Sequence, residues 1–207
     1  YEKYDLVRIL RKGRYKYIRN CQAFYPDGLQ NNYRYRMLAY AQWRKMHGDG
    51  KLNAAQQAFF KAKPVEALYD IENDPYEVNN LAGDPQHAKK LAELRNLLKK
   101  RMKGLPDLSL YPESYLVEHA LDNATEFGQE HADAISQLLD VANLSWLPFE
   151  DAKADLEKAI ASTNPMHRYW GFTVCSCFGD DAKSLIPAAE KALVDENLMV
   201  RFRATEF

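Results

Sequence analysis

The residues of this sequence best suited to chemistry are cations placed among aromatic rings in its first part. Arg14, Lys16, Arg34 and Arg36 stand next to or between tyrosines. Cationic side chains pair with anions, and aromatic rings stack on nucleic-acid bases, so an anionic polymer could recognise this pattern. In the first interpretation, these four residues are the candidate contacts of the chain with an anionic ligand. The alternative is that the rings belong to the core while the charges are solvated.

The charges of the chain are distributed unevenly. Residues 1–63 contain 14 Lys and Arg against 4 Asp and Glu, whereas residues 64–207 contain 14 against 25. The total net charge of −1 conceals this difference. A basic segment of this kind predicts an anionic partner. That partner is either a ligand or an acidic surface of another domain, and the sequence leaves both open.

Other reactive side chains have spacings that do not fit the usual sites. An EF-hand loop starting at Asp70 would need glycine sixth and glutamate twelfth, where Pro75 and Leu81 stand. The three cysteines form no disulfide framework. The histidines do not fall at metal-ligand spacing; they are His47, His87, His119, His131 and His167. We therefore expect no metal, no cofactor and no catalytic residue in this chain.

Hydrophobic periodicity and turn residues predict three strands and a long helix in the first half. Strands are expected at 5–10, 14–20 and 68–71, and helices at 32–46, 53–60 and 85–103. Asp74 has the features of a helix N-cap, with Pro75 at the first helical position and Glu77 at the third, so a capping box is expected. Gly104 marks the end of the long helix.

After Pro112 the pattern is entirely helical, with helices expected at 113–123, 126–141 and 149–161. The segment that begins at Glu157 then matches the segment that begins at Glu190, and Arg168 matches Arg201 at the same offset. Such a period predicts helix pairs that stack on one another. The repeat resembles the HEAT type. A chance alignment of amphipathic helices is the alternative.

Two segments of the first half resemble sulfatases. Residues 66–82, Glu-Ala-Leu-Tyr-Asp-Ile-Glu-Asn-Asp-Pro-Tyr-Glu-Val-Asn-Asn-Leu-Ala, resemble the strand and turn signature near the C-terminus of that family. Residues 7–18 resemble a hairpin of the same family that ends in Tyr-Lys-Tyr-Ile. The spacing between the two is most similar to the branch that contains heparan N-sulfatase. The resemblance covers residues 1 to about 113.

The resemblance implies a hydrolase of sulfate esters or sulfamates that uses calcium and a formylglycine made from Cys or Ser. The Cys/Ser-x-Pro-x-Arg motif for that residue is absent here. We therefore expect the catalytic domain to precede Tyr1 and this chain to be inactive alone. The resemblance also implies a periplasmic or secreted protein. It favours a sulfated glycan over nucleic acid as the partner of Arg14, Lys16, Arg34 and Arg36.

The expected fold is α+β: a small antiparallel sheet with helices over residues 1–110, like the sulfatase C-terminal subdomain, followed by an α-helical, HEAT-like repeat region over residues 111–207, which we expect to be truncated at its end. No apolar run approaches the roughly 20 residues that span a membrane. The expected function is the non-catalytic C-terminal portion of a sulfatase, which packs on the catalytic domain and helps to shape its substrate pocket. The alternative is a standalone helical-repeat module with a basic arm that binds anionic polymers.

Overall fold

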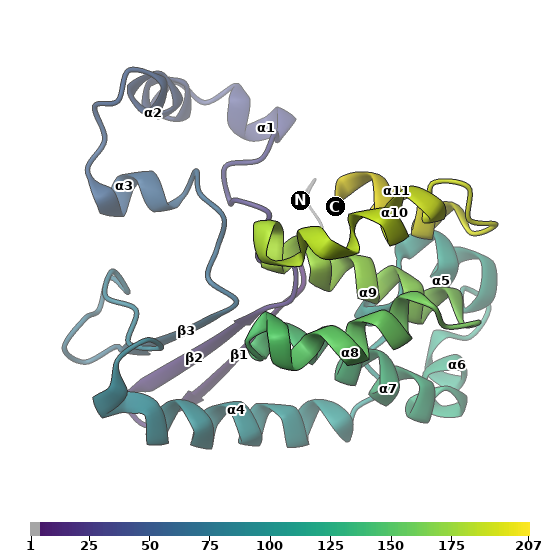
Figure 1. The fold of residues 1–207 in the computed structure, drawn as a ribbon. Helices are drawn as coiled ribbons and strands as arrows, with labels where there is room; N and C mark the ends of the chain where they lie inside the picture. The colour runs from purple at the N-terminus through teal and green to yellow at the C-terminus, as the bar shows by residue number, and fades with distance from the viewer. Residues whose placement is uncertain (1–4) are drawn as a thin grey trace.

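The computed structural model describes residues 5–207 and combines one three-stranded sheet with many helices (Figure 1). The strands are β1 (Val7–Lys12), β2 (Tyr15–Asn20) and β3 (Glu66–Asp70). The helices of the first half are α1 (Asn32–Tyr35), α2 (Leu38–Gly48), α3 (Ala54–Ala58) and α4 (Ala88–Lys103). Those of the second half are α5 (Glu113–His119), α6 (Ala124–Glu130), α7 (Ala132–Ala142), α8 (Phe149–Ile160), α9 (Pro165–Phe178), α10 (Ile186–Ala192) and α11 (Leu198–Glu206). The α+β class is therefore as expected.

The sheet is antiparallel with the order β1-β2-β3. Gly13 makes the turn between β1 and β2 with a left-handed φ of 59°, which glycine adopts without strain. Alternation along β2 places Tyr17 on one face, opposite Leu68 of β3, and Ile18 on the other, opposite Ala67. Tyr17 and Leu68 are fully buried, and α4 packs against this side of the sheet.

Helix α4 follows its predicted pattern closely. Leu91, Leu94, Leu98 and Met102 are all buried, because spacings of three and four residues keep them on one face. Gly104 caps its C-terminus, as expected. A short 3-10 turn at Pro85–His87 precedes the helix, and the Asp84 side chain caps that turn. The apolar face of α4 therefore covers one face of the sheet and makes it part of the core.

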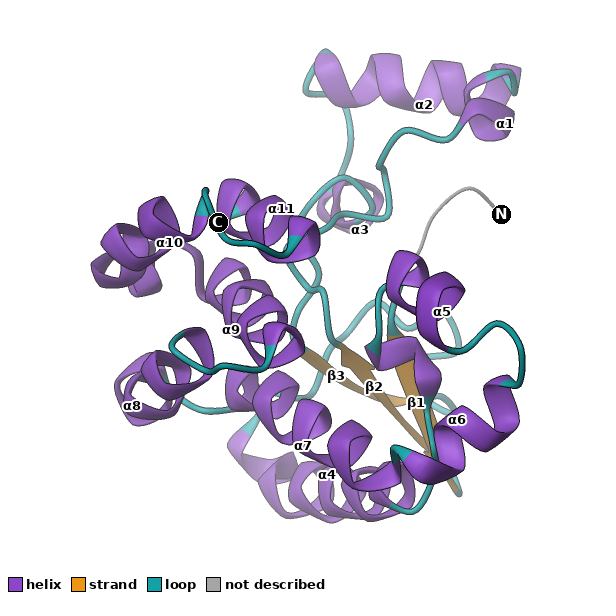
Figure 2. Ribbon diagram, turned by 90° about the vertical axis from the view of Figure 1, so that its right-hand side faces the viewer, coloured by secondary structure: helices purple, strands orange, loops and turns teal. Residues whose placement is uncertain are grey.

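The second half is built around α9, which packs against α7, α8 and α11 (Figure 2). Gly171 of α9 lets α8 approach closely, since a Cβ there would lie 3.0 Å from the Ile160 Cγ1 atom. One hydrophobic cluster contains Tyr17 and Leu68 of the sheet together with Trp170 and Phe172 of α9. The sheet and this part of the helical region therefore share one core.

Three expected helices differ from those observed. The helix predicted at 32–46 is divided, because Met37 has extended backbone that turns α2 so that Tyr40 packs on the rings after α3. The helix predicted at 126–141 is divided at His131, which lies between α6 and α7 outside helical geometry. Helix α5 ends at His119, four residues before the predicted Asn123. Periodicity reports neither the packing of Tyr40 nor the backbone geometry of His131, so it did not predict where these helices end.

Residues 24–63, which we name the arm, carry α1, α2 and α3 and stand apart from the rest of the structure in Figures 1 and 2. We name residues 5–23 and 64–207 the body. The arm has an aromatic cluster of its own, made by Tyr40, Trp43, His47, Phe59 and Phe60. Within the described residues, no helix has both the length and the apolar character needed to cross a membrane.

Candidate functional site

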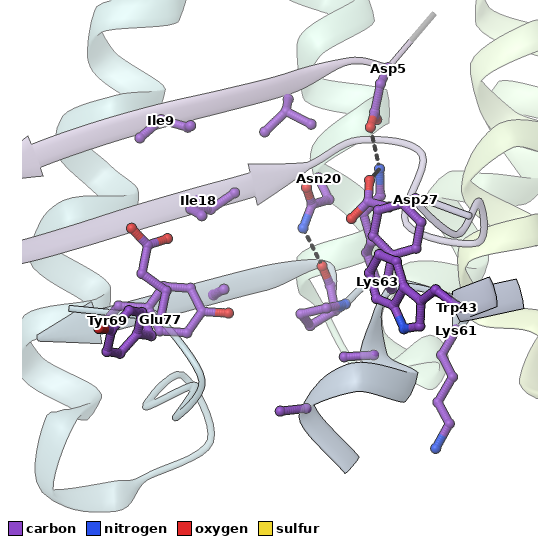
Figure 3. Close-up of a pocket in the computed structure, with 18 residues that line it drawn as sticks. Asp5, Ile9, Ile18, Asn20, Asp27, Trp43, Lys61, Lys63, Tyr69 and Glu77 are labelled. Carbon is purple, nitrogen blue, oxygen red and sulfur yellow. Dashed lines mark hydrogen bonds and ion pairs between the residues drawn. The ribbon is translucent and has the colours of Figure 1, made fainter. Parts of the chain in front are cut away.

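A concave region of about 700 Å³ lies between the open face of the sheet and the arm, and we name it the groove (Figure 3). The sheet contributes Val7, Ile9, Ile18, Ala67 and Tyr69, while the arm contributes Trp43 and Phe59, and the loop after β3 contributes Tyr76. Ile9 is 54% exposed and Tyr76 is 87% exposed. The groove therefore carries apolar side chains that face solvent, beside charged residues such as Lys63 and Glu77.

Most charged groups that line the groove are in ion pairs, and the remaining one, Lys61, is exposed and points away from the other lining residues (Figure 3). Lys63 Nζ lies 2.5 Å from Asp5 Oδ2 and 3.9 Å from Asp27 Oδ1. Glu77 accepts both of its 2.7 Å hydrogen bonds from Lys16 Nζ. Paired charges can be covered without leaving an isolated buried ion, which would be costly. The groove therefore suits an apolar protein surface better than a polyanion.

The loop after β3 closes the free edge of that strand. Asn80 accepts a hydrogen bond from the Leu68 N–H at 2.9 Å and donates from Nδ2 to the Glu66 carbonyl at 3.1 Å. The Leu81 N–H donates to the Leu68 carbonyl at 2.8 Å. An uncovered edge strand would offer these groups to another chain. The Asn-Leu pair of the sequence signature thus has a structural role at the sheet edge.

The predicted capping box at Asp74 is wrong, because no helix follows it. The Asp74 carboxylate accepts from the backbone N–H groups of Val78 at 3.2 Å and Asn79 at 2.8 Å, within a loop. Glu77 has a φ of 55°, a left-handed conformation that is uncommon for residues other than glycine. Its side chain binds Lys16 instead of the Asp74 backbone. A distant ion pair has replaced the local cap.

The four predicted anion contacts do not form one cluster. Arg14 pairs with Asp70 at 2.7 Å, and Lys16 pairs with Glu77 at 2.7 Å, both beside the sheet. Hydrogen bonding with Tyr15 and the charge of Asp70 raise the pKa of Arg14. The two cations of the sheet therefore have intramolecular carboxylate partners.

The other two predicted contacts are on the arm. Arg34 donates to the Asp27 carbonyl at 2.7 Å and lies over the Phe59 ring at 5.1 Å, so it is partly structural. Arg36 is exposed, and among residues 5–207 its guanidinium has neither an ion pair nor a hydrogen bond. Beside it Tyr33 is 70% and Leu38 is 88% exposed. We name Tyr33, Arg36, Met37 and Leu38 the arm tip.

Sequence reasoning missed the role of Arg19, which is fully buried. Its Nη2 donates to the Ala142 carbonyl at 2.8 Å and to Ser145 Oγ at 2.7 Å, and its guanidinium lies over the Trp146 ring. Arg19 thus joins β2 to the end of α7. The signal was its position two residues after Tyr17 on the same face of the strand.

A second buried network lies beside Arg19. Glu66 accepts hydrogen bonds from Tyr17 Oη and, at 2.7 Å, from Arg95 Nε of α4. Burial, followed by the hydrogen bond with Glu66, raises the pKa of Tyr17 well above its usual value. Tyr17 therefore stays protonated, and the network holds α4 to the sheet.

No group of three His, Cys, Asp or Glu side chains in residues 5–207 is arranged to hold a metal ion. Cys21, Cys175 and Cys177 are free thiols. Burial raises the pKa of Cys175 to about 12, so its reactive thiolate is scarce at neutral pH. Within residues 5–207 the cysteines are therefore poor nucleophiles, because they are largely buried and their thiolates are scarce.

Among curated proteins, the chain is similar to an ulvan-active sulfatase of Formosa agariphila. The two are 37% identical over 114 residues, which is 55% of this chain and 19% of the relative. The chain therefore spans less than a fifth of the relative's length. No family model matches, and no solved structure matches. The chain contains a sulfatase-related region, and the HEAT resemblance and the heparan N-sulfatase branch remain predictions.

Proposed function

We propose that this chain is the non-catalytic C-terminal portion of a sulfatase, a hydrolase of sulfate esters or sulfamates. The observation that carries the proposal is the 114-residue similarity to a sulfatase that is far longer than the matched part. The catalytic domain, with its formylglycine and calcium, would be encoded upstream. This chain supplies neither group. Periplasmic or secreted localisation belongs to the same proposal, because it follows from the sulfatase resemblance.

In this proposal the groove receives the catalytic domain. Its apolar side chains include Ile9 and Tyr76, both largely exposed in this chain, and interface cores are depleted of charged residues. The pairing of Lys63 with Asp5 lets these two groups be covered without isolating either charge. The arm then forms one wall beside the docked domain, and its tip extends beyond the contact.

The arm tip would contact the substrate. The matched relative is named for activity on ulvan, and we propose a sulfated glycan as the substrate class here. Arg36 is the predicted contact whose side chain has the fewest intramolecular partners, and it follows the exposed Tyr33 by three residues, directly after α1. Arginine suits a sulfate group because its planar donors match an oxyanion. Arg14 and Lys16 would act only if they left their carboxylate partners.

The proposal is tested by one substitution in two contexts. Ile9→Glu places a charge in the groove. In residues 1–207 alone it should change stability by less than about 0.5 kcal/mol, as exposed substitutions usually do. In the longer gene product it should lower both the melting temperature and the aryl-sulfate turnover. Leu121→Glu is the control, because Leu121 is 73% exposed on the segment between α5 and α6.

Two results would contradict the proposal. One is an equal effect of Ile9→Glu in both contexts. The other is a gene that encodes no catalytic domain before residue 1, which would favour the standalone module with a basic arm. Residues 1–207 alone should also show no aryl-sulfate turnover with added calcium, since a covalent mechanism needs an activated nucleophile. Turnover that survived repurification would refute the non-catalytic role.

A further inference from the structure

The last helices form two pairs that match in sequence, namely α8 with α9 and α10 with α11. Asn164 caps α9 by accepting from the Met166 N–H at 2.9 Å. Asn197 caps α11 by accepting from the Met199 N–H at 3.0 Å. We name the separation between Asn164 and Asn197 the repeat period. Because the two caps use the same atoms at matched positions, the sequence repeat is also a repeat of local structure.

The arginines of the two pairs also match. Arg168 Nη1 donates to the Ser162 carbonyl at 2.9 Å, and Arg201 Nη1 donates to the Asp195 carbonyl at 2.8 Å, each six residues earlier. Arg168 has a second partner: its Nε and Nη2 each lie 2.8 Å from a carboxylate oxygen of Asp195 in the following pair. Arg201 has no such carboxylate within the described residues. Within the described residues, the arginine–carboxylate link from one helix pair to the next is therefore formed by Arg168 and not by Arg201.

The outer face of α9 is covered, and the matched face of α11 is open. Tyr169 of α9 is 3% exposed, and its Oη accepts a 2.7 Å hydrogen bond from Arg203 of α11. Phe202, at the matched position of α11, is 50% exposed, and Leu198, one turn earlier, is 66% exposed. Figure 2 shows α7, α9 and α11 in successive positions, with α11 the last.

We infer that the outer face of α11 binds a third helix pair of the same repeat period, carried by the polypeptide that follows Phe207 in the gene product. The inference rests on continuity with the α9–α11 interface, which buries the tyrosine matched to Phe202. It also rests on charge, since Arg201 repeats the position from which Arg168 binds a carboxylate. It does not depend on the sulfatase relationship.

This inference predicts specific residues of the third pair. An Asp or Glu stands one repeat period after Asp195, where it pairs with Arg201 as Asp195 pairs with Arg168. An Asn or another capping residue stands one repeat period after Asn197 and begins the second helix of the pair. Apolar side chains from that helix cover Phe202 and Leu198. A stacked pair buries such faces because a single pair cannot bury them alone.

The test compares Leu198→Glu in residues 1–207 and in a protein extended through the third pair. The variant should shift the melting temperature of residues 1–207 by less than about 2 °C and lower that of the extended protein by about 5 °C or more. Val117→Glu on α5, which is 56% exposed in the wild type, is the control and should act equally in both. Charge reversal with Arg201→Glu should destabilise the extended protein more than residues 1–207, where it removes only the hydrogen bond to the Asp195 carbonyl and a favourable charge near Asp195.

Three outcomes would overturn the inference. The first is an equal effect of Leu198→Glu in both proteins. The second is a gene that ends at Phe207 or lacks the carboxylate one repeat period after Asp195. The third is a dimer of residues 1–207 in light scattering that Leu198→Glu dissociates, because the face would then bind a second copy of this chain.

Discussion

The arm and the body use the same residue type in opposite ways. Arg19 of the body is fully buried and donates to a carbonyl and a hydroxyl at the end of α7. Arg36 of the arm is exposed, and its guanidinium has no ion pair or hydrogen bond among the described residues. Both belong to the basic segment of residues 1–63. The comparison teaches that net charge locates a basic segment, while strand alternation and packing decide which of its cations a ligand can reach.

The largest effect is expected at Arg19. Replacement by leucine removes the buried guanidinium that donates to the Asn20 carbonyl and the Ser145 hydroxyl, while the Ala142 carbonyl keeps its 2.9 Å hydrogen bond from Ser145 Oγ. Each unsatisfied buried group costs about 1–3 kcal/mol, so Arg19→Leu should lower the free energy of unfolding by about 2–4 kcal/mol. Urea unfolding measures it. Arg36→Leu is the matched control. Similar losses in the two variants would break the distinction between the body and the arm.

A local effect is expected in the arm. Trp43 stacks on Phe59 with ring centroids 4.6 Å apart and contacts Phe60 at 5.2 Å. Trp43→Ala should remove about 2 kcal/mol of local protection from residues 24–63. The global melting temperature should move by less than about 2 °C, because the body keeps its own core. Hydrogen exchange by mass spectrometry measures the protection of the arm separately from that of the body. Loss of protection throughout the body would contradict an independent arm cluster.

Ionisation of Asp195 is expected to add about 1 kcal/mol to the free energy of unfolding, so this contribution should depend on pH. Burial opposes ionisation of this carboxyl, but hydrogen bonds from Arg168 and the Asn197 N–H outweigh it, so the pKa of Asp195 is lowered. A lowered folded-state pKa stabilises the protein above the unfolded-state pKa of about 3.9, and this contribution is lost as the pH falls through the folded value.

Asp195→Asn tests this linkage by thermal unfolding between pH 3 and pH 7. It should cost about 1 kcal/mol at pH 7, with a smaller difference from the wild type at pH 3. Asp155→Asn on the exposed face of α8 is the control, since its partner Lys158 is also exposed. A difference that is constant across the pH range would exclude the ion pair as its origin.

The smallest effect on stability is expected at Arg36. Arg36→Ala should change the free energy of unfolding by less than about 0.5 kcal/mol but weaken binding of heparin at low salt. Binding should fall steeply toward physiological salt, because exposed charges are screened. Arg101→Ala on α4 is the matched control, since Arg101 is also exposed. Equal binding of a sulfated oligosaccharide and single-stranded DNA would leave only a generic cationic surface.

Much of the fold was predictable from the sequence because its signals are local. The leucines of α4, its end at Gly104 and the three strands all follow from short patterns. Local sequence patterns gave the wrong structure where contacts with distant residues determine the backbone. Lys16 draws Glu77 away from the predicted cap, and packing of Tyr40 divides the predicted helix at 32–46.

The candidate site was less predictable than the fold. The four cations could be named from the sequence, but Asp70 and Glu77, the partners of Arg14 and Lys16, lie in a distant part of the chain. The groove combines side chains from the sheet, the arm and the loop after β3, and no spacing in the sequence reports such a meeting. Only the tertiary structure distinguishes the exposed Arg36 from the others.

The most direct test of the account is hydroxyl-radical footprinting of residues 1–207 and of the longer gene product. The groove is proposed to be covered by the catalytic domain and the arm tip to stay accessible. Oxidation of Tyr76, which is 87% exposed in this chain, should therefore fall several-fold in the longer protein. Oxidation of Tyr33 should stay unchanged until a sulfated glycan is added. Equal oxidation of Tyr76 in both proteins would contradict docking at the groove.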